Sequence, residues 1–187
     1  MKFSMKKVTV LLADGFEEIE ALTVVDLLRR AKVYVDTVSI TDDYTVRGAH
    51  GIPVQTEDLI TEIDFKESDM IVLPGGMPGT TNLKEDENVR KAVQEAYDDG
   101  RYVAAICAAP TILADMGLLK GKRATCYPDM ESEIEDAYLT GAPVATAENI
   151  ITSQGVGTAI DFALKLIEVL ISEEKAVEIA DSIVYQR

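Results

Sequence analysis

One cysteine in this sequence is placed where a thiol could act as a nucleophile. The segment YVAAICAAPTIL reads as an apolar β-strand that ends at Cys107 and turns at once into a helix. Small neighbours such as Ala108 permit a nucleophile elbow, in which a strand, a reactive residue and a helix follow each other closely. A thiol at a helix start can have its pKa lowered to between about 3.5 and 7.5. We therefore expect Cys107 to be reactive, whereas Cys126 lacks this placement and is expected to be an inert core thiol.

Two glycines follow another apolar strand and could complete a site for acyl or aldehyde chemistry. Gly75 and Gly76 stand in the segment LPGG. Glycine permits backbone conformations that direct two N–H groups at one point. Such a pair could hold the oxyanion that forms when Cys107 attacks a carbonyl carbon. A plain loop is the alternative when LPGG is considered alone.

Three glutamates lie at the start of the first predicted helix. Its apolar face is formed, at 100° per residue, by Ala21, Val24, Leu28 and Ala31. Glu17 and Glu20 fall on or beside that face, and Glu18 is expected to point outward. A carboxyl group near an apolar face has a raised pKa and can stay protonated while donating to a thiolate. Helix geometry does not separate Glu17 from Glu20, and all three carboxylates could instead simply complement the helix dipole.

Histidine is nearly absent, which limits the chemistry that is available. The chain holds one histidine, His50, in a predicted hairpin, so a Cys–His dyad would require that loop to reach the elbow. One histidine and two separated cysteines do not make a metal site or a disulfide framework. We expect no metal or other cofactor, and a reducing, cytoplasmic compartment.

The segments that must position these residues alternate between strand and helix patterns. The expected strands are Lys7–Ala13, Val33–Ile40, Asp69–Leu73, Tyr102–Cys107, Val144–Ala147 and Ile150–Thr152. The expected helices are Glu17–Ala31, Glu85–Asp99, Pro110–Met116, Thr158–Ile171 and a short one after Ser172. Strands that are apolar on both faces and alternate with helices predict an α/β fold with a doubly wound, mostly parallel sheet. A small β-hairpin is expected as an insertion in Thr45–Asp58.

The topology brings the unusual residues together. In an open α/β sheet, ligands bind outside the carboxyl ends of the strands. The segments ADGFEEIE and PGGMPGT and the residue Cys107 each follow one of the predicted strands. We therefore expect the glutamates, the glycines and the thiol to meet at one edge of the sheet.

Composition excludes several classes of function. The 187 residues include 18 Lys and Arg against 33 Asp and Glu, which gives a formal charge of −15. Such a chain repels phosphate backbones, and no basic patch is present, so nucleic-acid binding is not expected. No run approaches the roughly 20 apolar residues of a membrane helix. Without repeats, linkers or a composition shift, we expect residues 1–187 to form a single domain.

Together these motifs resemble the ThiJ/PfpI superfamily in its DJ-one-like branch, and in particular its bacterial members. The matching segments, in order along the chain, are DGFEEIEA, VDLLRRA, VLPGG, AAICAAP and SQGVGTAIDFALKLI. The resemblance implies a flavodoxin-like α/β domain that forms homodimers. It implies that Cys107 is the reactive cysteine and that Glu20 is its protonated partner. It also implies backbone N–H donors at Gly75, Gly76 and Ala108.

The sequence departs from the superfamily at positions that concern peptidase activity. Protease-like members have a histidine immediately after the cysteine, where this chain has Ala108, so peptide hydrolysis is not expected. Eukaryotic relatives have a histidine where this chain has Tyr127, which cannot serve as a base near neutral pH. His50 falls where relatives place a basic residue that reaches the partner subunit's site. Tyr127 and His50 are therefore expected as neighbours of the site.

Two functions remain open on these grounds. The first is a cofactor-independent glyoxalase or deglycase that acts on small α-oxoaldehydes or their early adducts, with Cys107 as nucleophile and Glu20 as proton carrier. The second is an oxidative-stress sensor or chaperone that acts through oxidation of Cys107. An exposed, reactive thiol beside an acid suits both, and the sequence does not separate them.

Overall fold

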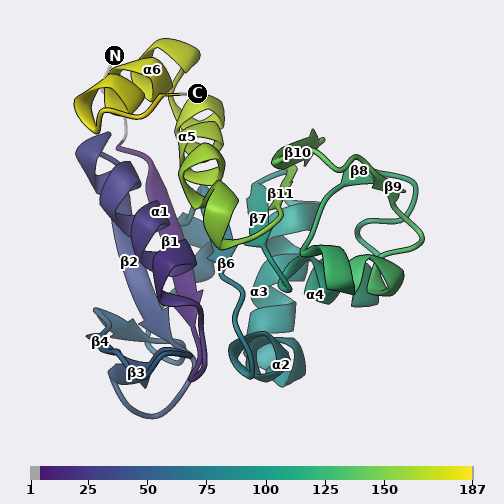
Figure 1. Ribbon diagram of the computed structural model, residues 1–187. Coiled ribbons are helices and arrows are strands. Elements are labelled where there is room, and N and C mark those ends of the chain that lie inside the picture. The colour runs from purple at the N-terminus through teal and green to yellow at the C-terminus, as the bar shows by residue number, and fades with distance from the viewer. Residues whose placement is uncertain (1–4, 187) are drawn as a thin grey trace.

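A seven-stranded sheet forms the centre of the protein (Figure 1). The computed structural model describes residues 5–186. The strand order is β10-β11-β7-β6-β1-β2-β5. The strands are β1 Lys7–Leu12, β2 Tyr34–Ser39, β5 Asp58–Leu59, β6 Met70–Leu73, β7 Tyr102–Ile106, β10 Val144–Ala147 and β11 Ile150–Ser153. Neighbouring strands run parallel except β10 and β11, which are antiparallel.

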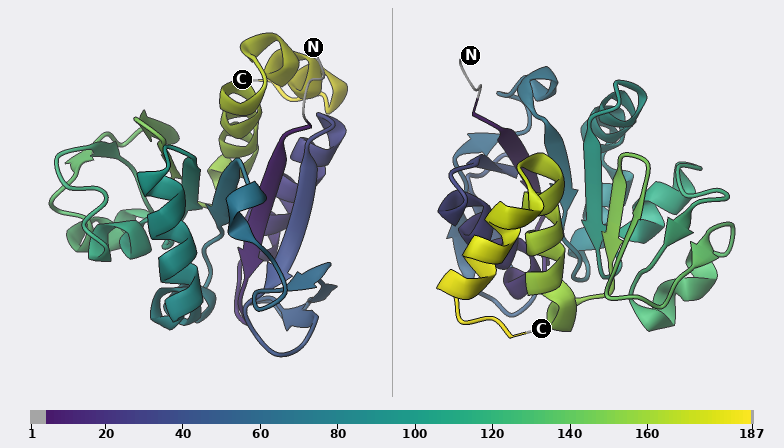
Figure 2. Two further views of the ribbon diagram at one scale, coloured as in Figure 1. Left: turned by 180° about the vertical axis from the view of Figure 1, so that it is seen from behind. Right: turned by 90° about the horizontal axis from the view of Figure 1, so that it is seen from above.

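Helices cover both faces of the sheet (Figure 2). One apolar core packs under α1 Glu18–Arg30, α5 Ala159–Leu170 and α6 Glu173–Ser182. A second core lies on the other face, under α2 Gly79–Glu85, α3 Glu87–Asp98 and α4 Pro110–Asp115. The central strands are apolar on both sides because both of their faces are covered. The predicted doubly wound, mostly parallel α/β fold is confirmed.

The segment before α3 differs from the sequence-based expectation. A single helix was expected over Glu85–Asp99, but the structure has α2 and α3, separated at Asp86. The side chain of Asp86 accepts hydrogen bonds from the N–H groups of Asn88, at 2.8 Å, and Val89, at 3.0 Å. It therefore caps a new helix instead of continuing the previous one. The expectation missed α2 because its short sequence, between Pro78 and Asp86, has little apolar periodicity.

Short elements complete the structure away from the main sheet. The predicted hairpin is present as β3 Thr45–Arg47 and β4 Pro53–Gln55. The sequence did not predict three short 3-10 helices or a small parallel pair of strands. The 3-10 helices are η1 Phe65–Glu67, η2 Pro128–Glu133 and η3 Val156–Thr158, and the paired strands are β8 Arg123–Ala124 and β9 Tyr138–Leu139. These segments are too short to show a hydrophobic period. Within residues 5–186, no helix combines the length and the apolar character that crossing a bilayer requires.

The sheet brings together the strand ends that the sequence singled out. Strand β6 lies between β1 and β7, and all three run in the same direction. Their carboxyl ends therefore meet at one edge. The loop before α1, the glycine pair after β6 and Cys107 after β7 all start from this edge.

Candidate active site

Cys107 stands at a strained turn between β7 and α4. Its backbone φ is 66°, in the left-handed region that side-chain-bearing residues rarely occupy. Hydrogen bonds hold it in this conformation: its N–H donates to the carbonyl of Ser153 at 2.9 Å, and its carbonyl accepts from the N–H of Tyr127 at 2.8 Å. Strain of this kind collects at functional sites. The geometry is that of a nucleophile elbow, and Cys107 is half-buried.

Glu20 is the carboxyl group beside this thiol. It lies in the first turn of α1 and is fully buried. Its Oε2 accepts the N–H of Gly75 at 2.8 Å, and its Oε1 has no hydrogen-bond partner in the described part of the chain. Burial raises the pKa of Glu20 to about 7, although the adjacent Cys107 thiol and the N–H of Gly75 oppose the rise. A buried carboxylate oxygen without a donor is costly, and protonation relieves that cost.

The pKa of Cys107 corrects one expectation from the sequence. A helix start was expected to lower it, but burial and the negative charge of Glu20 raise it to about 12. Helix α4 has only 6 residues, so its dipole is short. The N–H groups of Ala108 and Gly76 act in the opposite direction and stabilise the thiolate. The effect of Glu20 on the pKa of Cys107 depends on whether Glu20 is ionised. A proton on Glu20 removes the repulsion between the carboxylate and the thiolate and supplies a hydrogen-bond donor to the sulfur.

The three expected backbone N–H donors do not all face the thiol. The N–H groups of Gly76 and Ala108 face the thiol of Cys107. That of Gly75 donates to Glu20 instead, so Gly75 holds the carboxyl group in place and is not directed at an oxyanion beside the sulfur. Gly75 was expected to face the oxyanion because glycine pairs can aim both N–H groups at one point. Here the chain turns at Gly76, whose φ is 91°, and the two N–H groups diverge.

Gly75→Ala is expected to destabilise the folded protein by about 1–3 kcal/mol, the usual cost of overpacking. A Cβ at this position would lie 2.6 Å from the Cβ of Cys107 and 2.7 Å from Oε2 of Glu20. Urea unfolding measures the change. Gly157→Ala is the control, because a Cβ there meets no atom within 4 Å, and it should cost clearly less. Equal costs for the two variants would show that the contact at Gly75 is not tight.

An open cavity of about 450 Å³ gives access to the thiol and to Glu20. A Cβ built on Gly155 would lie 3.8 Å from Sγ of Cys107 and 3.9 Å from Oε1 of Glu20, so both groups border the same space. Tyr127, which is 44% exposed, forms part of the wall, as expected for a site neighbour. The lining residues are Glu17, Glu20, Gly76, Cys107, Tyr127, Pro128 and the loop 154–158.

The loop 154–158 was missed as part of the site by sequence reasoning, which took GVGT as a structural helix start. It follows β11, which pairs with β7 in parallel and so ends at the same edge of the sheet. The carbonyl of Ser153, the last residue of β11, also accepts the N–H of Cys107. Ligands of an open α/β sheet bind outside the carboxyl ends of its strands, and the same reasoning applied to β11 would have identified this loop.

Glu18 and His50 form a separate cluster, which corrects the expectation that Glu18 points outward. Glu18 is 4% exposed, and its Oε1 accepts the backbone N–H of His50 at 2.8 Å. The His50 ring Nδ1 lies 2.9 Å from Oε2 of Glu18 and 3.6 Å from Oε2 of Glu17. The β3–β4 hairpin covers the start of α1, and so a carboxyl group on the outer side of the helix becomes buried.

His50 does not border the cavity at Cys107 within the described part of the chain. Its side chain is 69% exposed, and its pKa is raised by the hydrogen bond to Glu18 and by the charges of Glu17 and Glu18. Ligand atoms of Glu17, Glu18 and His50 lie within 4.8 Å of one another, as a metal site would require. Hydrogen bonds from His50 already occupy both Glu18 oxygens, however. A link from His50 to a partner subunit stays a prediction.

Cys126 differs from Cys107 mainly in access. It is fully buried, and its Sγ lies 3.3 Å from the carbonyl oxygen of Tyr127. Burial, with the charges of Glu131 and Glu133, raises its pKa to about 12. The sequence analysis predicted different pKa values for Cys107 and Cys126. In the structure both pKa values are raised, and the two thiols differ in exposure instead.

Comparisons with known proteins agree with the fold and the motifs. The family described as "DJ-1/PfpI family" matches residues 6–169. Protein DJ-1 homolog B of Arabidopsis thaliana is 39% identical over 186 residues, covering 98% of this chain and 42% of that protein. The chain therefore spans less than half of this plant relative.

Two further relatives match along nearly their whole length. The "Glutathione-independent glyoxalase DJ-1" of Schizosaccharomyces pombe is 34% identical, covering 91% of this chain and 94% of that protein. The structure of oxidised DJ-1 from Toxoplasma gondii superposes with a TM-score of 0.92 at 36% identity, covering 97% of this chain and 100% of that one.

Proposed function

This chain belongs to the DJ-1/PfpI family, and from that premise we propose that it is a cofactor-independent glyoxalase or deglycase. Its substrates are small α-oxoaldehydes such as methylglyoxal, or their early adducts with amines. The observation that carries the proposal is the pair formed by Cys107 and the buried Glu20, whose pKa is raised to about 7 and whose Oε1 has no partner among the described residues. A glyoxalase among the relatives supports the same reaction class.

The reaction begins with the proton shared by the two side chains. When Glu20 holds the proton, the Cys107 thiolate is free to add to the aldehyde carbon. The N–H groups of Gly76 and Ala108, which face the sulfur, stabilise the oxygen that becomes negative. Glu20 gives its proton to this oxygen and becomes a carboxylate, which can act as a base. It then moves a proton from the former aldehyde carbon to the adjacent carbonyl carbon, while the hydroxyl proton passes to the second oxygen, and this leaves a 2-hydroxy thioester on Cys107. Water hydrolyses the thioester and releases a 2-hydroxy acid and the thiol.

A redox sensor or stress chaperone is the second candidate, and it uses the same atoms. Oxidation would convert Cys107 to a sulfenic and then a sulfinic acid. A protonated Glu20 and the N–H groups of Gly76 and Ala108 are suitable donors to sulfinate oxygens. The similar structure of oxidised DJ-1 from Toxoplasma gondii favours this candidate.

Pretreatment with hydrogen peroxide is expected to lower methylglyoxal turnover at least tenfold, since an oxidised Cys107 has lost its nucleophilic sulfur. Turnover is measured without glutathione, before and after treatment. In parallel, suppression of aggregation of a heat-denatured client is measured for both samples. If treated protein loses turnover and gains no client protection, the enzyme proposal stands. Absence of turnover in untreated protein, with protection that appears on oxidation, would establish the sensor instead.

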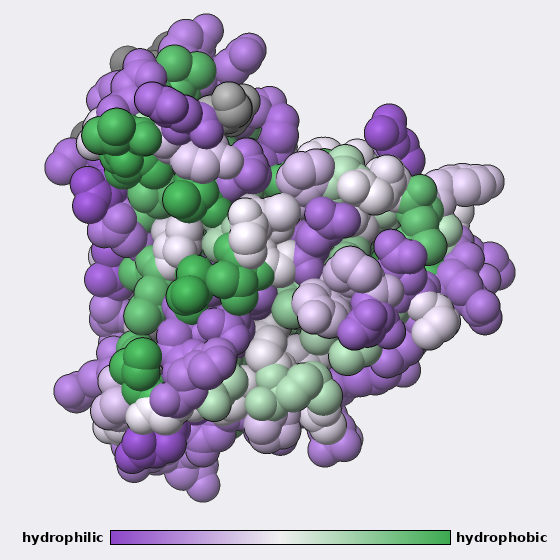
Figure 3. Space-filling model, viewed as in Figure 1, coloured by the Kyte–Doolittle hydropathy of each residue, from purple (hydrophilic) through white to green (hydrophobic). Residues whose placement is uncertain are grey.

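We also propose that the protein is a cytoplasmic homodimer. Ile19 is 53% exposed and Leu22 is 36% exposed on the outer face of α1, and Val156 is 43% exposed beside the cavity. Figure 3 shows hydrophobic residues along the face that carries α1 and α5. Exposed apolar surface of this kind is typical of protein–protein interfaces.

Light scattering after gel filtration is expected to give about twice the chain mass of 20.4 kDa. Ile19→Asp places a charge in the proposed interface and should shift the protein to the monomer. Tyr138→Asp, at a residue 68% exposed on the distant β9, is the control and should leave the dimer intact. A wild-type monomer, or dissociation by both substitutions, would contradict this interface.

A further inference from the structure

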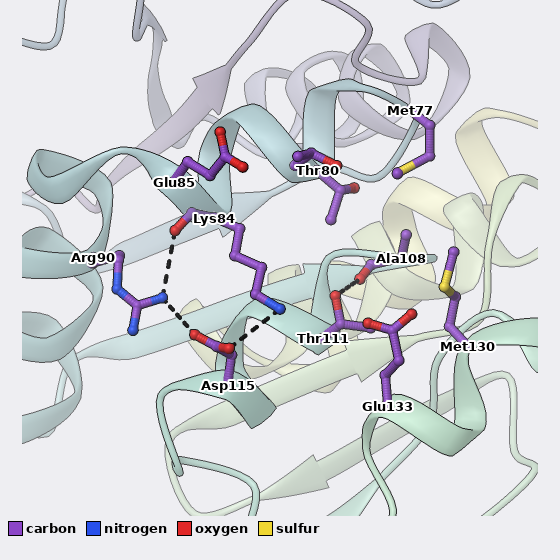
Figure 4. A pocket seen from close by; sticks show the side chains of 11 residues that line it. Met77, Thr80, Lys84, Glu85, Arg90, Ala108, Thr111, Asp115, Met130 and Glu133 are labelled. Atoms are coloured by element: carbon purple, nitrogen blue, oxygen red, sulfur yellow. Dashed lines mark hydrogen bonds and ion pairs between the residues drawn. The ribbon is translucent and has the colours of Figure 1, made fainter.

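The cavity at Cys107 differs in character from a neighbouring cavity of about 480 Å³. The neighbouring cavity is lined by charged side chains, and Figure 4 shows Lys84 and Arg90 both directed at Asp115. Nζ of Lys84 lies 3.3 Å from Oδ1 of Asp115, and Nη1 of Arg90 lies 2.7 Å from its Oδ2. By contrast, no lysine, arginine or histidine within residues 5–186 lines the cavity at Cys107. An anionic group of a ligand would therefore find no basic side chain of this chain beside the thiol.

The polar side chains that follow β11 already have partners inside the protein. Oγ1 of Thr158 lies 2.7 Å from Oγ of Ser153 and accepts the N–H of Gly155 at 3.1 Å. The side-chain amide of Gln154 donates to the carbonyl of Gly141 at 3.4 Å. A ligand that extends from the sulfur along this wall therefore depends mainly on apolar contacts.

The ring of Tyr127 provides part of the apolar surface. Tyr127 is 44% exposed and lines the cavity, and its backbone N–H donates to the carbonyl of Cys107 at 2.8 Å. Pro128 also lines the cavity and starts η2, and a proline restricts the backbone at this point. The ring is therefore carried by a constrained segment that is bonded directly to the elbow. An accessible aromatic ring favours contact with another aromatic ring, stacked or edge to face, over contact with an aliphatic group.

Gly155 allows one ligand to reach both the sulfur and this ring. A Cβ built on Gly155 would lie 3.6 Å from Cδ2 of Tyr127 and 3.8 Å from Sγ of Cys107, so the ring and the sulfur border the same small space. Because glycine has no side chain, a ligand bound at the sulfur can lie against the backbone here. In an α-oxoaldehyde the substituent starts two bonds from the carbon that the sulfur attacks. The substituent is therefore the part of such a molecule that meets Tyr127.

We propose that Tyr127 and Gly155 form a subsite for an aromatic group beside Cys107. With the proposed function, on which this inference rests, the preferred substrates are then aromatic α-oxoaldehydes such as phenylglyoxal. The cavity volume of about 450 Å³ is sufficient for a molecule of this size. The sulfur adds to the aldehyde carbon, the hydrogen of that carbon passes as a proton to the adjacent carbon, and water hydrolyses the thioester. Phenylglyoxal and one water molecule thus give mandelic acid, and no oxidant or reductant is needed.

Alkylation of Cys107 by phenacyl bromide tests the subsite without relying on turnover. The sulfur displaces bromide from the CH₂ carbon and loses its proton to the solvent, and the phenyl ketone then lies where an aromatic α-oxoaldehyde would. Bromoacetone has a methyl group in place of the ring, and bromomethyl cyclohexyl ketone has a saturated ring with the same number of carbons. Mass spectrometry of the Cys107 peptide gives each rate, which is divided by the rate with glutathione to remove differences in intrinsic reactivity. Phenacyl bromide is expected to react at least about tenfold faster than bromoacetone and about threefold faster than the cyclohexyl reagent.

Protein variants assign this preference to the subsite. Tyr127→Leu should lower the ratio of the phenacyl bromide rate to the bromoacetone rate about tenfold. Gly155→Ala should lower the same ratio about threefold, since its methyl group holds the ligand away from Tyr127, and its contacts at 3.6–3.9 Å are compatible with the fold. Tyr138→Leu is the control, because Tyr138 is 68% exposed and does not line the cavity, and the ratio should not change. Far-UV circular dichroism verifies the fold of each variant.

Turnover of phenylglyoxal and methylglyoxal separates this inference from the proposed function. In the wild type, kcat/KM for phenylglyoxal should be at least about tenfold higher, measured as initial rates of 2-hydroxy acid formation. Equal normalised alkylation by the three reagents, or a ratio that Tyr127→Leu leaves unchanged, would overturn the aromatic subsite even if methylglyoxal is turned over. Selective alkylation by phenacyl bromide without turnover of either aldehyde would support the subsite and overturn the proposed function alone.

Discussion

Cys107→Ser is expected to lower methylglyoxal turnover at least about 1,000-fold, as loss of a catalytic nucleophile usually does. Serine preserves the size of the side chain, but its hydroxyl does not ionise near neutral pH. Glu20 could not take the proton of a hydroxyl as it can take that of a thiol. The measurement is kcat/KM for methylglyoxal in the absence of glutathione. A variant that keeps more than about one tenth of the activity would exclude Cys107 as the nucleophile.

Cys126→Ser is the matched control for this experiment. Cys126 is fully buried and stands apart from the residues that line the cavity at Cys107. Its replacement should leave turnover within about threefold of the wild type, although a hydroxyl in an apolar core lowers stability. Unfolding of both serine variants at the assay temperature should be monitored, so that a loss of activity is not confused with a loss of fold.

The fold and the position of Cys107 were predictable because each depends on local patterns. Strands that are apolar on both faces, alternating with amphipathic helices, already define a parallel sheet with two covered faces. Because the carboxyl ends of parallel strands meet at one edge of the sheet, Gly76 and Cys107, which each follow such a strand, are placed at that edge. The structure brings these residues together as that reasoning required.

The glutamates were harder to assign, because their surroundings depend on a segment far along the chain. Helix periodicity put Glu18 on the outer side of α1, which is correct for the helix alone. The hairpin then folds over that side, and the N–H groups of His50 and Ile52 bind Glu18 at 2.8 Å and 3.4 Å. Periodicity describes one helix and cannot show which loop will cover it. Glu20 differs from Glu18 through its contact with Gly75, which is likewise distant in sequence.

The electrostatic environment of Cys107 was not predictable from its position. The expected low pKa of Cys107 rested on its position at the start of a helix, which favours a thiolate. The structure adds burial and the charge of Glu20, which favour a neutral thiol and raise the pKa to about 12. The balance depends on where the shared proton resides, and that is a property of the pair and not of either residue.

Glu20→Gln is expected to lower methylglyoxal turnover about 100-fold, since a positioned acid–base group contributes roughly 100- to 10,000-fold. Glutamine preserves the shape of the side chain and can still accept the N–H of Gly75, but an amide does not carry a proton between carbons. Glu17→Gln is the matched control: the Glu17 side chain borders the same cavity but does not bond Gly75, whose carbonyl accepts only the backbone N–H of Glu17, and the substitution should change turnover by less than about threefold. Equal losses in both variants would refute the role of Glu20.

The stability of Glu20→Gln provides a test that does not depend on turnover. Burial raises the pKa of Glu20 from 4.5 to about 7, so between these values the folded protein keeps a proton that the unfolded chain has released. By linkage, the contribution of Glu20 to the free energy of unfolding falls as the pH rises from 4.5 to about 7. Glutamine does not titrate, so the stability of the variant relative to the wild type should increase across this window. Urea unfolding at about pH 5 and about pH 8 measures the difference. A difference that is the same at both values would mean that Glu20 is ionised throughout, and it could not then act as the proton carrier.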